Sequence, residues 1–250
     1  MDATTRRPRV AGEVAIVVVL LVIYDRIAER LSRHRRTGDS HGLAILRGER
    51  RVHLAWEHAT NNWLSAHRAA EVVATSYYQC LHESTALVVL VGCYLRRADL
   101  YRAARNALVL INVVGLSIFV LYPVAPPRSL PGQGFIDSAA QVWFVHYPPD
   151  HFGAMPSLHL AWAVWAAVVG RQVFRHRALR GFLTLHPLFM GIAVVSTANH
   201  YVLDVVAGVA LGLAAVMVLV VRPMTLPRLQ PRWPPAPAAA TAGEGQAPCQ

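Results

Sequence analysis

The stretch that decides how this chain is organised is Phe-Gly-Ala-Met-Pro-Ser-Leu-His at residues 152–159, with a counterpart Asn-His-Tyr-Val-Leu-Asp at residues 199–204. Each stands at one end of a long apolar run. Ionisable side chains at membrane depth are costly, so His159, His200 and Asp204 are candidate functional residues. His200 and Asp204 are four residues apart, on one face of a helix. The carboxylate can therefore accept the Nδ1 proton of the imidazole and leave Nε2 as a nucleophile or base.

The two stretches together resemble a known family. Pro-Ser-x-His, followed about forty residues later by His-x-x-x-Asp, resembles the type 2 phosphatidic acid phosphatase superfamily. The exact motifs, Ala-Met-Pro-Ser-Leu-His and His-Tyr-x-x-Asp, are similar to those of its inositol phosphorylceramide synthase-like branch. The resemblance covers residues 77–221. It implies that His200 attacks phosphorus, that Asp204 orients His200, and that His159 protonates the leaving oxygen. A phosphohistidine would then pass its phosphoryl group to water or to an alcohol.

Two further residues are candidates for binding the substrate phosphate. Arg128 can offer a bidentate guanidinium fork to phosphate oxygens. Ser157 and the backbone N–H groups that follow Pro156 can add hydrogen-bond donors at a helix start.

The chain departs from the superfamily pattern at several cationic positions. Leu121 stands where the first motif has a lysine, and Ser129 follows Arg128 where a proline is usual. The Ser-Arg pair ahead of the last histidine is replaced by residues 193–194, Ala-Val. Arg105 and His151, and also Arg26, are candidates to replace the missing phosphate-binding cations.

The composition is that of a multi-pass membrane protein. Of 250 residues, 54% are hydrophobic and only 15% are charged. The net charge of +10 is carried by arginine alone, in clusters between apolar runs, as expected for segments that face anionic lipid headgroups. We expect no nucleic-acid partner. The three cysteines show neither a disulfide framework nor metal-ligand spacing.

We predict an all-α fold, a six-span transmembrane helical bundle with an interfacial amphipathic helix between the first two spans. The spans are expected at residues 10–31, 71–95, 107–122, 152–170, 181–198 and 201–221. The first run could also be a signal peptide, but no small-residue cleavage site follows it. The chain would divide into a basic N-terminus with the first span (1–31), an amphipathic interfacial segment (32–69), a five-span catalytic core (70–222) and a disordered Pro- and Ala-rich tail (223–250).

Arginine counts predict the orientation in the cell membrane. The loops at 96–105 and 171–180 carry four arginines each, whereas 124–151 carries one. The positive-inside rule places the first two in the cytoplasm and the motif-bearing ends outside. The same topology puts nine arginines of residues 25–69 outside, which a helix lying on the membrane surface would explain.

Several alternatives stay open. The histidines could be satisfied polar residues of a non-catalytic structural protein or transporter, although a transporter predicts polar residues spread through more of the spans. Zinc could bind His151, His159, His200 and Asp204, since imidazole and carboxylate suit it; we expect no metal and no cofactor.

The substrate would be a membrane lipid phosphoester. Transfer to an alcohol acceptor, with Asp137, Glu49 and Glu57 as candidate contacts, competes with hydrolysis of a lipid phosphate or polyprenyl (di)phosphate.

Overall fold

The computed structural model of this chain describes residues 7–32, 35–143 and 152–221. The predicted all-α class is confirmed for these residues. Its helices are α1 (Val10–Ser32), α2 (Arg35–Arg51), α3 (Glu57–Ala66), α4 (Arg68–Arg96), α5 (Ala98–Leu121), α6 (Ser138–Trp143), α7 (Leu158–Val173), α8 (Arg177–Ser196) and α9 (Val202–Val216). A 3₁₀ turn spans Pro127–Ser129, and a π-helical turn at Met217–Val221 extends α9.

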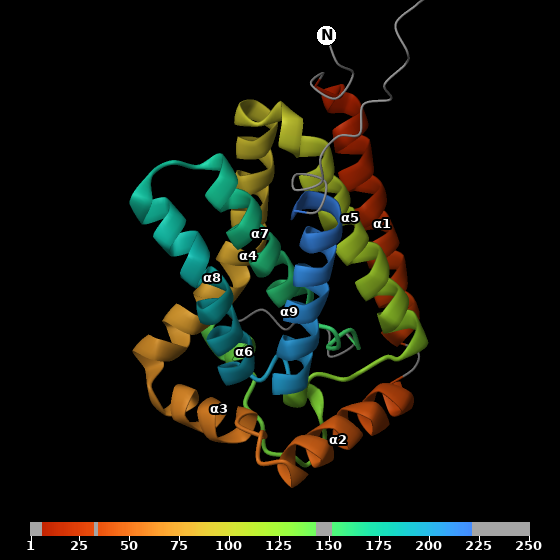
Figure 1. Ribbon diagram of the computed structural model, residues 1–250. Coiled ribbons are helices and arrows are strands. Elements are labelled where there is room, and N and C mark those ends of the chain that lie inside the picture. The colour runs from red at the N-terminus through yellow and green to blue at the C-terminus, as the bar shows by residue number, and fades with distance from the viewer. Residues whose placement is uncertain (1–6, 33–34, 144–151, 222–250) are drawn as a thin grey trace, which may run out of the picture.

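Helix α7 lies at the centre of the bundle. It packs against α4, α5, α8 and α9, while α1 packs on the outer side of α5 (Figure 1). Helices α2 and α3 lie across one end of the bundle (Figure 1). The side chain of Trp165 on α7 is fully buried, and its Nε1–H donates to the carbonyl oxygen of Ala104 at 2.8 Å, which ties α7 to α5.

Two glycines of α9 let it approach α7 closely. A Cβ at Gly208 would collide with the backbone oxygen of Ser157, and a Cβ at Gly212 would lie 2.7 Å from the oxygen of Ala161. Small residues at these two positions therefore allow the close packing of α9 against α7. It brings the start of α9, with Asp204, against the start of α7, with His159.

Within the described part of the chain, three helices are long and apolar enough to cross a membrane, namely Ala98–Leu121, Arg177–Ser196 and Val202–Val221. Helix α7 has 16 residues, about 24 Å at 1.5 Å per residue, which is less than the roughly 30 Å of a bilayer core. Helices α1 and α4 are longer but carry more charged residues. The six-span bundle and its interfacial helix remain proposals.

Two helical segments of the structure differ from the sequence prediction in where they begin or divide. The fourth apolar run was expected to be helical from Phe152, but α7 begins at Leu158, because residues 152–154 are extended and pair with the chain after α5. Segment 32–69 forms the two helices α2 and α3 instead of one, separated at His53, whose φ of 58° is left-handed. His151 and the predicted tail at 223–250 lie outside the described residues.

Candidate active site

Three loops meet at the end of the bundle that α2 and α3 cover. The loop after α5 pairs with the loop before α7, since the Val124 N–H donates to Phe152 O at 2.8 Å and the Ala154 N–H donates to Val124 O at 3.1 Å. The Arg128 N–H donates to Ala198 O, in the loop before α9, at 2.9 Å. Residues far apart in the sequence are thereby held in one small volume.

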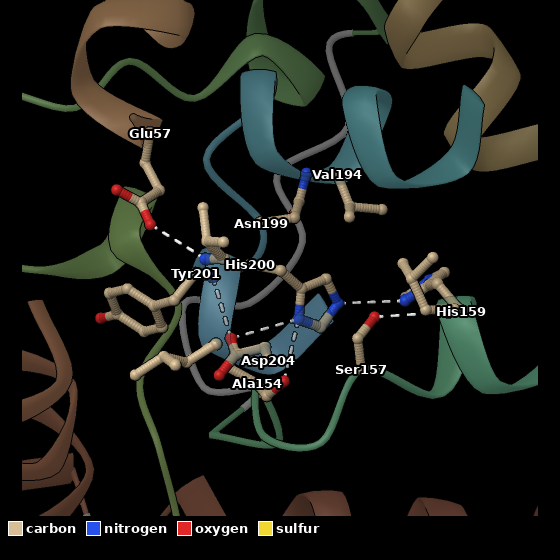
Figure 2. Close-up of polar contacts among 12 residues, drawn as sticks. Glu57, Ala154, Ser157, His159, Val194, Asn199, His200, Tyr201 and Asp204 are labelled. Carbon is tan, nitrogen blue, oxygen red and sulfur yellow. Dashed lines mark hydrogen bonds and ion pairs between the residues drawn. The ribbon is translucent and has the colours of Figure 1, made fainter. Parts of the chain in front are cut away.

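His200 lies at the centre of this volume, between His159 on one side and Asp204 and Ala154 on the other (Figure 2). Its Nδ1 is 2.8 Å from the carbonyl oxygen of Ala154 and 3.4 Å from Oδ2 of Asp204. Both partners accept hydrogen bonds, so we assign the ring proton to Nδ1. The lone pair of Nε2 then points toward His159, whose Nδ1 is 3.1 Å away.

Asp204 also shapes the backbone around His200. Its Oδ2 accepts the N–H of Tyr201 at 2.9 Å and so caps the start of α9. The Tyr201 hydroxyl donates to Ala125 O at 2.8 Å, in the loop after α5. The carboxylate therefore both neighbours the imidazole and fixes the turn that carries it.

Aromatic side chains from α4 and α7 surround His159. The rings of His82 and Tyr78 have centroids 4.2 and 4.8 Å from that of His159, and Trp162 stacks on His82 at 4.7 Å. His82 is thus a third imidazole beside the pair. The motifs do not include it, and the only sequence signal for it was a polar residue within an otherwise apolar run.

Arg128 is held by polar contacts of its own. Its Nε donates to Oδ1 of Asn199 at 2.8 Å, and its NH1 is 3.0 Å from Oδ2 of Asp137. Ser157 is the N-cap of α7, where its Oγ is 3.5 Å from the N–H of Leu160. Arg128, Asn199 and the two histidines line the same cavity.

Arg105, a further candidate for phosphate binding, is not brought to the histidines. It lies near the opposite end of α5, and its NH1 forms an ion pair with Oε1 of Glu13 at 2.7 Å. Arg105 and Phe119, which lines the cavity near the histidines, are separated by 14 residues of helix, or about 21 Å.

Two buried glutamates from α2 and α3 hold the start of α9. Oε1 of Glu49 accepts the N–H of Leu203 at 2.6 Å, and Oε1 of Glu57 accepts the N–H of Val202 at 3.0 Å. Both side chains are fully buried. We refer to Glu49 and Glu57 as the carboxyl clamp. They were considered as contacts for an alcohol acceptor, but their burial removes them from that role.

The two carboxyl groups of the clamp also lie close enough to each other to share a hydrogen bond. Burial, together with that hydrogen bond, raises the pKa of Glu49 to about 9. Oε2 of each glutamate is buried without a hydrogen-bond partner among the described residues, so a proton on Glu49 shared between the two carboxyl groups would satisfy both. The clamp therefore joins α2 and α3 to the end of α9 that follows His200.

The histidines open into an elongated cavity of about 830 Å³. It runs between α1, α4 and α5, and apart from its two ends it is lined mainly by apolar side chains. Among the described residues no group of three or more His, Cys, Asp or Glu side chains is arranged to hold a metal ion.

A histidine with a free Nε2, a second histidine within hydrogen-bond distance and a nearby arginine can together act on a phosphate group. Set in a helical bundle with membrane-length apolar helices, and opening to an apolar cavity, this site defines a membrane phosphoesterase or phosphotransferase.

The comparison with protein families agrees with this class. The family model of the PAP2 superfamily, the type 2 phosphatidic acid phosphatases, matches residues 43–218. The chain therefore belongs to this superfamily, as its paired motifs indicated. No curated protein and no solved structure matches the chain. Helix α1 lies outside the matched residues, whereas the clamp and both histidines lie within them.

Proposed function

We propose that this protein is an integral-membrane enzyme that transfers the phosphoryl group of a lipid phosphoester through a covalent intermediate on His200. The observation that carries the proposal is the 3.1 Å contact between His159 Nδ1 and His200 Nε2 at one end of a long apolar cavity. A phosphate that entered from the cavity would displace this contact and part the two rings, and would then meet a nucleophile on one side and a proton donor on the other.

The proposed reaction has two steps. The lone pair of His200 Nε2 attacks phosphorus, the bond from phosphorus to the leaving oxygen breaks, and His159 gives that oxygen its proton. In the second step an acceptor hydroxyl gives its proton to His159 while its oxygen attacks phosphorus and the N–P bond breaks. The contacts of His200 Nδ1 with Ala154 and Asp204 keep the nucleophilic nitrogen pointed at the substrate.

Charge on the phosphate would be balanced mainly by Arg128. Its guanidinium is held at two nitrogens by Asn199 and Asp137, so its direction is set before substrate arrives. Ser157, Arg105 and His151 were also predicted to bind the phosphate. Ser157 is fully buried at the start of α7, where its hydroxyl caps the helix, so its contact with phosphate stays a prediction, whereas Arg105 lies too far from the histidines to reach the same phosphate.

We place transfer to an alcohol first, as in an inositolphosphotransferase. Gln79 and Glu83 on α4 and Tyr24 on α1 line the same cavity as the histidines. Amide, carboxylate and phenol groups are suited to hydrogen-bond a polyol. Hydrolysis is the second candidate, because burial of the carboxyl clamp removes two of the groups first considered for an acceptor and water needs no subsite.

The site is proposed to face the outside of the cell membrane, in a six-span arrangement. The arginine-rich loops 96–105 and 171–180 join helices at the end of the bundle opposite the histidines. Under the positive-inside rule those loops are cytoplasmic. Helices α2 and α3 would then lie along the outer surface and cover the site.

The test uses purified full-length protein and lipid phosphoesters labelled in the phosphate. Rapid quenching should trap label on the protein, stable in alkali and labile in acid, as expected for phosphohistidine. His200→Ala should abolish trapping, whereas a control His176→Ala, at an exposed position at the opposite end of the bundle, should retain it. Label that persisted in His200→Ala would contradict the assignment of the nucleophile.

The acceptor is identified from the products of the same reaction. With inositol or another polyol present, transfer predicts a labelled phosphopolyol or a new lipid. Release of inorganic phosphate, unaffected by any alcohol, would identify a phosphatase instead.

A further inference from the structure

We infer that the cavity beside the histidines is a closed-ended binding groove for the hydrocarbon chain of the substrate, and that its length limits which chains are accepted. We call it the α1–α4 groove. The inference rests on the proposed function and extends it from the phosphate to the lipid chain.

The groove has two polar ends and an apolar middle. His159, His200 and Arg128 line one end. Glu13, Tyr101 and Arg105 line the other. Between them the walls are side chains such as Val17 and Leu21 of α1 and Leu87 and Val91 of α4. An amphiphile with its phosphate at the histidines would place its chain along these walls.

The groove is also open sideways along this middle part. Leu21 of α1 and Leu87 of α4 both line it, yet each is 61% exposed. Exposed apolar side chains on both rims form a gap through which a chain can pass from the membrane without leaving an apolar environment. Helix α1 packs on α5, and Figure 1 shows α1 running along the outside of that helix.

Polar contacts close the far end. Oε1 of Glu13 is 2.7 Å from NH1 of Arg105, and the hydroxyl of Tyr101 donates to Oε2 of Glu13 at 2.9 Å. The hydroxyl of Tyr94 donates to Pro8 O at 3.0 Å, which joins the end of α4 to the residues before α1. These contacts join α1 and the residues before it to α5 and α4 across the end of the groove, so this end is suited to stop a chain.

The length of the groove gives the expected limit. On α1 its lining residues run from Val10 to Tyr24, or about 21 Å at 1.5 Å per residue. One leaflet of a bilayer core is only about 15 Å deep, half of the roughly 30 Å total. The groove therefore matches an alkyl or polyisoprenoid chain that is longer than the depth of one leaflet.

Chain-length dependence is the first test. Full-length protein would be assayed with a series of single-chain lipid phosphates that share one headgroup and differ only in chain length. The value of kcat/KM should rise with chain length until the extended chain reaches about 21 Å, and should then level off or fall.

A matched pair of substitutions on α1 provides the control. Val17 lines the groove about 10 Å from Tyr24, whereas Val19, two residues on, points away from it. The two side chains are similarly exposed, at 46% and 54%. Val17→Trp should lower the ratio of kcat/KM for long over short chains by about tenfold. The indole ring would fill part of the groove, so several methylene groups of a long substrate chain would lose their contact with its walls. Val19→Trp should leave that ratio unchanged.

Binding measured without turnover separates the inference from the proposed function. Native mass spectrometry of His200→Ala loaded with the same series should show retention that rises with chain length and is weakened by adding Val17→Trp. Equal effects of Val17→Trp and Val19→Trp, or no dependence on chain length, would overturn the groove while leaving the phosphoryl-transfer proposal intact. Length-dependent retention with no turnover of any lipid phosphate by the unsubstituted protein would support the groove and overturn the proposed function.

Discussion

Glu49→Gln tests how the carboxyl clamp holds the end of α9. Burial and the hydrogen bond with Glu57 raise the pKa of Glu49 to about 9, so its carboxyl group is protonated at neutral pH. A glutamine amide has nearly the same shape as that protonated group. Its oxygen can accept the N–H of Leu203, and its NH₂ can donate to Glu57. We therefore expect the free energy of unfolding to change by less than about 1 kcal/mol below about pH 4.5, where Glu49 is protonated in both the folded and the unfolded chain, and we expect Glu49→Gln to be the more stable form at neutral pH.

Glu49→Ala should be far more costly. It removes the oxygen that accepts the Leu203 N–H, and loss of a helix cap costs about 1 kcal/mol. It also leaves the buried carboxylate of Glu57 without the shared proton, and an unpartnered buried acceptor adds about 1 to 3 kcal/mol. The expected total is about 2 to 4 kcal/mol.

The pH dependence gives a sharper contrast. The pKa of Glu49 rises from 4.5 to about 9 on folding, so between these values the folded chain holds a proton that the unfolded chain has released. The contribution of Glu49 to stability is therefore complete below about pH 4.5, declines as the pH rises, and is gone above about pH 9. Glu49→Gln cannot release this proton, so its stability should fall less steeply over the same range.

The assay is unfolding of the purified protein in detergent, followed across this pH range for unsubstituted protein, Glu49→Gln and Glu49→Ala. Phosphohistidine formation on the same samples reports whether His200 stays in position. The shared proton would be refuted if Glu49→Gln lost as much stability as Glu49→Ala at neutral pH. It would also be refuted if the pH dependence of Glu49→Gln matched that of the unsubstituted protein.

Three further predictions concern the charge at the site, metal dependence and topology. Arg128→Lys should slow phosphohistidine formation by about tenfold to a hundredfold, because it loses one charge-assisted hydrogen bond; an unchanged rate would remove Arg128 from the site. Activity should persist in excess EDTA, and loss that only added zinc restored would favour the zinc alternative. Cys249, which lies outside the described residues, should be cytoplasmic, and its labelling by an impermeant thiol reagent in intact cells would invert the topology.

The sequence by itself determined the fold class, the family and the central histidine pair. Long apolar runs specify helices directly, because a backbone in an apolar environment must satisfy its own hydrogen bonds. The motifs at 152–159 and 199–204 identified His159, His200 and Asp204 from their position at the ends of apolar runs, their spacing and their family resemblance, and the structure places all three together. Local sequence was enough to select these residues, since each motif stands at the end of an apolar run and His200 and Asp204 are about one helical turn apart.

Only the tertiary structure decided which polar residues reach the histidines from other helices. Glu49, Glu57 and His82 have no motif, and their positions depend on how α2, α3 and α4 pack against α7 and α9. Arg105 was a reasonable candidate by charge, yet about 21 Å of rigid helix keeps it at the far end of the groove. Charge and hydrophobicity are properties of a residue and can be read along the chain. Proximity is a property of the packed bundle, because small differences in helix register and crossing determine which side chains share a cavity.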